Sequence, residues 1–127
     1  MVVLAHSQGS VIAADVLGEY YSSYEIDLIT VGSPIDSLYH SFLGIPIGLG
    51  LGAPQTRVRW VNLYRSGDYI GDKIERAQSI CIGSGGHTGY WTDKDVQERI
   101  AAAVVAKQAD SNPLCDSGHG TQTILFY

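Results

Sequence analysis

The chain has 127 residues, and its 8 Lys+Arg against 13 Asp+Glu give a formal net charge of −5. This length corresponds to a single domain spanning 1–127. Apolar residues make up 45% of the chain and charged residues 17%, and this composition excludes a disordered chain. The acidic balance and the absence of a run of lysines or arginines exclude nucleic acid and a polybasic membrane patch as partners.

The start of the chain, its longest apolar stretch and its two cysteines indicate the expected compartment. Apolar residues follow Met1 directly without a basic segment, so no targeting signal is expected in this stretch. The longest apolar stretch, Phe42 to Pro54, is broken by glycines and prolines and is shorter than the roughly 20 residues of a membrane span. Cys81 and Cys115 form no CxxC pair, so neither a disulfide framework nor a four-cysteine zinc site is expected. Two free thiols in a reducing compartment are favoured, which predicts a cytoplasmic protein.

The first sixty residues alternate between apolar runs of strand length and a helical segment. Val2–Leu4 is typical of a buried strand, Ser10–Tyr21 of a helix with a narrow polar stripe, and Ile26–Val31 of a second strand. A long connection, Ile35–Thr56, follows as a glycine-rich loop. This alternation predicts an α/β fold with a mostly parallel sheet and flanking helices.

The second half adds two more strands and one helix, for about four strands in all. The expected elements are a strand Val58–Tyr64, a weaker strand Ser79–Ile82, a helix Asp93–Lys107 capped by Thr92 with Asp95, and an irregular tail over 109–127.

The segment Ala5-His6-Ser7-Gln8-Gly9 lies between the first strand and the first helix. It matches the nucleophile elbow GxSxG except that Ala5 replaces the first glycine, and small residues are needed at both flanks because the turn is tight. Ser7 is therefore the candidate nucleophile, and the backbone N–H of Gln8 is one candidate donor to an oxyanion.

A serine hydroxyl needs a base, and four histidines compete for that role. His6 is held inside the elbow, His40 lies in the long connection and His119 in the tail. His87 is preferred, because it follows the fourth strand in a glycine-rich loop at the sheet edge where catalytic side chains gather. The structural alternative for His87 is a turn histidine that contacts Trp91.

The acid that would orient this base has three candidates. Asp68 directly follows the third strand and is preferred, whereas Asp72 is more typical of a solvated turn. Asp36 follows the second strand, where some related folds place the acid. Cys115 and His119 also have metal-ligand spacing, but two ligands in a tail predict no metal site.

Four segments taken in order resemble the C-terminal half of an α/β-hydrolase, similar to lipase-like serine hydrolases of bacteria. These segments are Val3–Ile12, Thr30–Pro34, Trp60–Gly71 and Gly86–Trp91. The resemblance implies a partial α/β-hydrolase fold, with Ser7 as nucleophile, Asp68 as acid and His87 as base.

An α/β-hydrolase has strands and an oxyanion loop before the elbow, so the resemblance also implies an N-terminally truncated chain. Val2–Leu4 would then be an edge strand with unpaired backbone groups, which predicts self-association through that edge. The expected function is a serine esterase acting on a small, hydrophobic ester. The alternatives are an acyltransferase with the same triad and a catalytically silent interaction module.

Overall fold

The computed structural model describes residues 1–19, 25–48, 51, 57–110 and 123–126. In chain order the elements are β1 (Val2–His6), α1 (Gln8–Glu19), β2 (Ile26–Val31), η1 (Ile35–Phe42), β3 (Val58–Tyr64), β4 (Gln78–Cys81), η2 (Tyr90–Thr92), α2 (Lys94–Asp110) and β5 (Thr123–Phe126). The segment η1 is a π-helix and η2 is a single 3₁₀ turn.

The strands form one sheet in the order β4-β3-β2-β1-β5, and every neighbouring pair is parallel. The predicted α/β fold with a parallel sheet is therefore confirmed. The expected bounds of β2 and β3 agree with the structure, since both are continuous runs of strand-forming residues. β2 is buried along its whole length, as a central strand covered on both faces should be.

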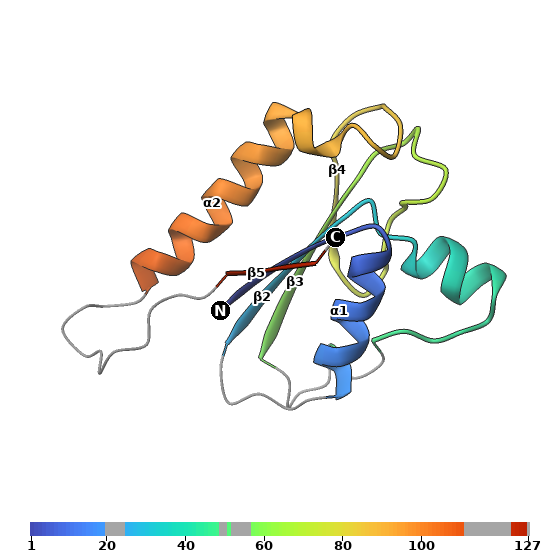
Figure 1. The fold of residues 1–127 in the computed structure, drawn as a ribbon, viewed down its shortest axis with the longest axis horizontal. Helices are drawn as coiled ribbons and strands as arrows, with labels where there is room; N and C mark the ends of the chain where they lie inside the picture. The colour runs from blue at the N-terminus through green and yellow to red at the C-terminus, as the bar shows by residue number, and fades with distance from the viewer. Residues whose placement is uncertain (20–24, 49–50, 52–56, 111–122, 127) are drawn as a thin grey trace.

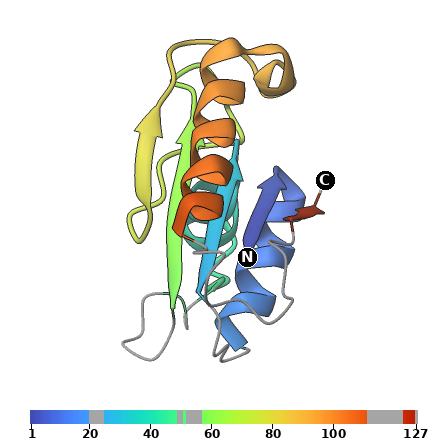
Figure 2. The ribbon, with the colours of Figure 1, turned by 90° about the vertical axis from the view of Figure 1, so that its left-hand side faces the viewer.

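The two α-helices cover opposite faces of the sheet (Figures 1 and 2). α1 connects β1 to β2, whereas α2 leads from β4 back to β5 at the other side of β1. Because strand–helix–strand crossovers are right-handed, a crossover that runs back along the sheet must lie on the other face. The result is a three-layer arrangement in which the carboxyl ends of β1 to β4 share one edge.

Each face of the sheet has its own apolar core because successive strand residues point in opposite directions. On the α1 face, Val3 and Leu28 pack with Val11 and Ala14 of the helix. On the α2 face the buried cluster consists of Val2, Leu4, Ile29, Val31, Leu63, Ile82, Tyr90 and Val96, with Ile100 and Val104 of α2 packed against it.

β1 is not an edge strand, so that prediction is wrong. β5 pairs with β1 over Val2↔Thr123 to Ala5↔Phe126, while β2 pairs with its other side. The predicted irregular tail over 109–127 is corrected by the same pairing, since α2 extends to Asp110 and Thr123–Phe126 forms a strand. Self-association through a free edge of β1 therefore loses its structural basis. From the sequence alone, the short apolar run at the end of the chain could not be assigned to the sheet. Its pairing partner, β1, lies at the other end of the chain, and no local pattern indicates that the two strands pair.

The long connection after β2 is not simply a loop. Its first part, Ile35–Phe42, is a π-helix in which the N–H of Leu43 donates to the carbonyl of Leu38 at 2.9 Å. A π-helix has no sequence signature of its own, and such turns occur frequently at functional sites. Leu38, Phe42 and Leu43 are exposed on this segment, with Phe42 at 79%.

Candidate active site

Ser7 forms a sharp turn between β1 and α1. Its φ is +52°, in the left-handed region that costs a non-glycine residue about 1–3 kcal/mol. The turn is held at both ends: the Ser7 N–H donates to Val31 O at 3.0 Å, and the Ser7 carbonyl accepts from the Ser10 N–H at 3.0 Å. The hydroxyl of Ser10 donates to that carbonyl at 2.5 Å and shares a 2.6 Å hydrogen bond with Ser33. The neighbouring backbone therefore compensates for the strain at Ser7.

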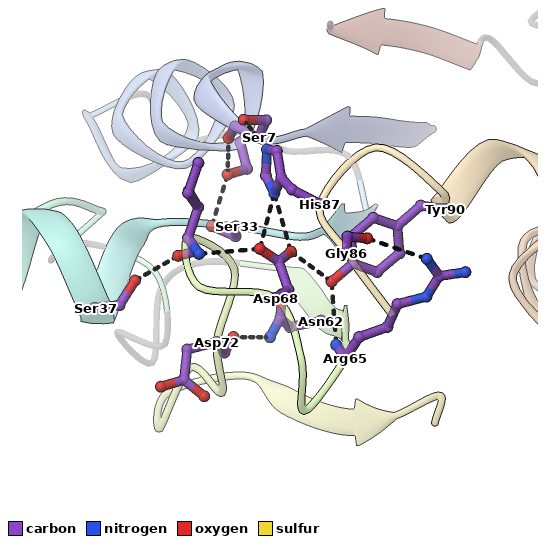
Figure 3. A network of polar contacts seen from close by, with 12 residues as sticks. Ser7, Ser33, Ser37, Asn62, Arg65, Asp68, Asp72, Gly86, His87 and Tyr90 are labelled. Atoms are coloured by element: carbon purple, nitrogen blue, oxygen red, sulfur yellow. Dashed lines mark hydrogen bonds and ion pairs between the residues drawn. The ribbon is translucent and has the colours of Figure 1, made fainter. Parts of the chain in front are cut away.

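Ser7, His87 and Asp68 form a continuous chain of hydrogen bonds (Figure 3). His87 Nε2 lies 2.7 Å from Ser7 Oγ, and its Nδ1 lies 2.9 and 3.1 Å from the two Asp68 oxygens. With Asp68 ionised, Nδ1 donates to the carboxylate and Nε2 accepts from the serine hydroxyl. This is the geometry that general-base activation of a serine requires.

Asp68 lies in the turn that follows β3, and its side chain is fully buried. Burial raises the pKa of this carboxyl, but donors from several directions outweigh it: the N–H groups of Gly71 and Ile70, the His87 ring and the Tyr90 hydroxyl. The Ile70 N–H and the Tyr90 hydroxyl lie 2.9 and 2.8 Å from the carboxylate. The pKa of Asp68 therefore stays below its ordinary value, and the group is a carboxylate at neutral pH.

Tyr90 is a buried residue whose hydroxyl both donates and accepts a hydrogen bond. It donates to Asp68 Oδ2 at 2.8 Å and accepts from the backbone N–H of Arg65 at 3.1 Å. Burial and the nearby negative charge of Asp68 raise the pKa of the phenol, so that it remains a neutral donor. Tyr90 therefore holds the carboxylate and connects it to the backbone of Arg65.

Replacing Tyr90 by phenylalanine is expected to lower the free energy of unfolding by about 1–3 kcal/mol, because it leaves the buried N–H of Arg65 without its acceptor. It also raises the pKa of Asp68. A carboxyl whose folded pKa lies below its unfolded value stabilises the fold above that unfolded value, and the stabilisation is lost as the pH falls through the folded pKa. The acid loss from this carboxyl should therefore be smaller in Tyr90→Phe and should be complete at a higher pH, because only the folded pKa moves. Urea unfolding across acidic pH measures this, with the 86%-exposed Tyr69→Phe as control. Identical profiles for the two variants would contradict it.

Two glycines allow the strand ends to approach closely around Asp68. A Cβ on Gly71 would lie 2.5 Å from Asp68 Oδ2 and 2.5 Å from the backbone of Gly32. A Cβ on Gly32, which has φ +56°, would lie 2.7 Å from the Tyr90 ring. These positions need glycine because backbone and carboxylate occupy the space of a side chain.

Gly71→Ala is expected to destabilise the protein by about 1–3 kcal/mol through overpacking and to displace Asp68 from His87. Gly86→Ala is the matched control, because its added Cβ would meet nothing within 4 Å. Thermal melts of the two variants should differ clearly. Equal melting temperatures would show that the Gly32–Gly71 contact can relax at no cost.

His6 is the second histidine of the site. Its ring stacks on His87 with centroids 5.2 Å apart and meets Trp91 edge-on at 5.3 Å. Burial and the charge of a protonated His87 lower the pKa of His6, so that its neutral form is favoured. Trp91 contacts the His6 ring, and His87 lies between Ser7 and Asp68.

The remaining candidates lie apart from this chain of hydrogen bonds. Asp72 is exposed and caps the N–H of Lys73 at 2.6 Å, and Asp36 accepts from the N–H of Glu75 at 2.8 Å. His40 is exposed on η1. Cys115 and His119 lie outside the described residues. Across the ranges that the structure describes, no group of three or more His, Cys, Asp or Glu is placed to hold a metal ion.

Gln8 is the first residue of α1, where backbone N–H groups have no partner within the helix. Its side-chain amide donates to the hydroxyl of Tyr39 on η1, which connects the elbow to the π-helix.

The N-terminal cap of α2 differs from the prediction. Asp93, rather than Thr92, accepts a hydrogen bond from the Asp95 N–H at 2.9 Å. Thr92 instead donates to the carbonyl of Gly89.

Tyr90 and Arg65 were not identified from the sequence as part of the site. The available signal was the spacing of Tyr90, three residues after His87, but a single aromatic at that distance is equally typical of a core residue.

Comparison with protein-family models, with curated protein sequences and with solved structures finds no match to this chain. Among the helices of the described part of the chain, none combines the length and the apolar character of a membrane span.

Proposed function

We propose that this protein is a serine hydrolase with a partial α/β-hydrolase fold that cleaves a carboxylic ester through an acyl-enzyme. The observation that carries the proposal is the chain from Ser7 Oγ to His87 Nε2 at 2.7 Å and from His87 Nδ1 to Asp68 at 2.9 Å, built on a strained serine at a strand–helix turn. A serine that only capped a helix would need neither the positive φ nor a histidine backed by a buried carboxylate.

The first half-reaction transfers the acyl group to the enzyme. Ser7 Oγ attacks the ester carbonyl carbon while its proton passes to His87 Nε2, and the carbonyl oxygen becomes an oxyanion near the Gln8 N–H. Asp68 stabilises the imidazolium without taking its proton. When the intermediate collapses, the carbon–oxygen bond to the alcohol breaks and His87 returns its proton to the leaving alkoxide.

The second half-reaction reverses these roles with water. His87 Nε2 removes a proton from water, whose oxygen attacks the acyl carbon, and collapse releases the acid and returns the proton to Ser7 Oγ. No cofactor takes part. An alcohol in place of water would give acyl transfer, so the ratio of acid to new ester, measured with added alcohol, distinguishes a hydrolase from an acyltransferase.

The exposed apolar residues of η1 and the following turn, Leu38, Phe42, Leu43 and Ile45, support a hydrophobic substrate. The hydrogen bond between Gln8 and Tyr39 places η1 next to the elbow. We therefore expect esters with longer acyl chains to have lower KM than acetate esters, because each buried methylene contributes about 0.8 kcal/mol.

The test is the intact mass of the chain after exposure to a fluorophosphonate, which reports an activated serine without knowledge of the substrate. We expect one adduct on the wild type, none on Ser7→Ala, and one on Ser41→Ala, whose serine is exposed on η1. An adduct that persists on Ser7→Ala would refute the assignment of the nucleophile. An unlabelled wild type that is folded would refute the hydrolase and favour the interaction module.

A further inference from the structure

Arg65 is a buried cation next to the site, and the proposed reaction does not use it. It follows β3 directly, its side chain is only 8% exposed, and its guanidinium points into the loop that carries His87. Nη1 donates to the carbonyl of Gly86 at 3.1 Å, and Nη2 donates to the carbonyl of Gly89 at 3.1 Å. The two acceptors lie on either side of His87, so one side chain holds both ends of the segment that presents the base.

The guanidinium is itself held from two further directions. Asp93 Oδ2 accepts from Nη2 at 2.5 Å, and the guanidinium carbon lies 4.6 Å from the centre of the Tyr90 ring. The other oxygen of Asp93 caps α2 through the Asp95 N–H. The interaction with Arg65 is the main cause that lowers the pKa of Asp93. Arg65 thus connects the His87 loop to the start of α2 and to the tyrosine that binds Asp68.

The loop itself is shaped to fit this side chain. A Cβ on Gly89 would lie 2.6 Å from Arg65 Nη1, and one on Gly85 would lie 3.0 Å from the same atom. Glycine has the greatest backbone freedom of any residue, so a loop with glycines at 83, 85, 86 and 89 requires external donors to adopt one conformation. Arg65 supplies those donors from the rigid end of β3.

We propose that Arg65 is a positioning residue for His87: its guanidinium clamps the Gly86 and Gly89 carbonyls and thereby sets the Nε2–Oγ distance to Ser7. This inference rests on the proposed hydrolase function. The clamp requires a planar group with several donors in fixed directions, and a lysine ammonium cannot reproduce it. Arg65 acts on the reaction through the position of His87, so its loss should slow the chemical step and leave substrate affinity nearly unchanged.

The test compares Arg65→Met and Arg65→Lys with Arg59→Met. Arg59 also lies on β3 and also pairs with an aspartate, Asp27, at 2.7 Å, but it is exposed and does not contact the His87 loop. We expect the maximal rate of fluorophosphonate labelling to fall on the order of 10²-fold in Arg65→Met, a size typical of a misplaced catalytic group, with half-saturation unchanged. Arg65→Lys should recover only a small part of the rate, and Arg59→Met should label as the wild type does.

Two further readouts separate positioning from general destabilisation. Free guanidinium at millimolar concentration should restore labelling in Arg65→Ala and leave Arg59→Ala unchanged. The far-downfield NMR resonance of the His87 Nδ1 proton, identified by its loss in His87→Gln, should be absent or broadened in folded Arg65→Met. This resonance tests the clamp even if the wild type does not label, an outcome that would refute the proposed function alone. A folded Arg65→Met that keeps both the resonance and the wild-type labelling rate would overturn the inference.

Discussion

Replacing Ser7 by alanine or His87 by glutamine is expected to lower kcat for ester hydrolysis on the order of 10⁶-fold. In the proposed mechanism Ser7 supplies the nucleophile, and His87 Nε2, 2.7 Å from the Ser7 hydroxyl, supplies the base. Without either group the covalent route is closed. Steady-state turnover of a chromogenic ester, with both variants shown to be folded by circular dichroism, measures the effect.

The double variant Ser7→Ala/His87→Gln provides the internal control. Because the two residues act in one proton transfer, the double variant should be no slower than either single one. His40→Gln, on the exposed surface of η1, should retain the wild-type rate. Losses that multiply in the double variant would show that Ser7 and His87 act in separate steps, contrary to the mechanism.

Asp68→Asn is expected to lower kcat on the order of 10⁴-fold while the fold remains intact. The carboxylate accepts the Nδ1 proton of His87 at 2.9 Å and so keeps Nε2 free to accept the serine proton. An amide in its place can donate to Nδ1, which stabilises the tautomer with the proton on Nε2, and that tautomer cannot act as a base. The pH–rate profile of the residual activity and the rate itself are the measurements.

Asp72→Asn and Asp36→Asn are the matched controls for Asp68, because they remove the two competing acid candidates. Asp72 is exposed and caps its own neighbour, and Asp36 binds the Glu75 N–H, so neither exchange should change kcat appreciably. A larger loss in either of them than in Asp68→Asn would move the acid to that residue and would contradict the hydrogen-bond chain.

The secondary structure was predictable where local pattern and burial agree. β2 and β3 are continuous runs of strand-forming residues, and their bounds are those expected from the sequence. The prediction failed for η1, because a π-helix differs from a loop only in hydrogen bonds that no residue pattern specifies. It failed again for β5, because these four residues near the end of the chain form a strand only by pairing with β1, which is remote in sequence.

The site was predictable to a similar degree. Parallel strands bring their carboxyl ends to one edge, so residues that follow β1, β3 and β4 were expected to meet, and Ser7, Asp68 and His87 lie within hydrogen-bond distance. The roles of Tyr90 and Arg65 could not be predicted, because both are defined by contacts across more than twenty residues of chain. Neither residue belongs to a motif with a fixed spacing.

The sequence by itself determined the alternation of strands and helices, the small residues around Ser7 and the order serine, aspartate, histidine along the chain. These properties depend on local sterics and on hydrophobic periodicity, which short segments express without the rest of the fold. Only the tertiary structure decided which aspartate faces His87, that β1 lies inside the sheet, and that Arg65 holds the His87 loop. Those outcomes depend on distances between segments remote in sequence, and such distances are set by the packing of the whole sheet and both helices.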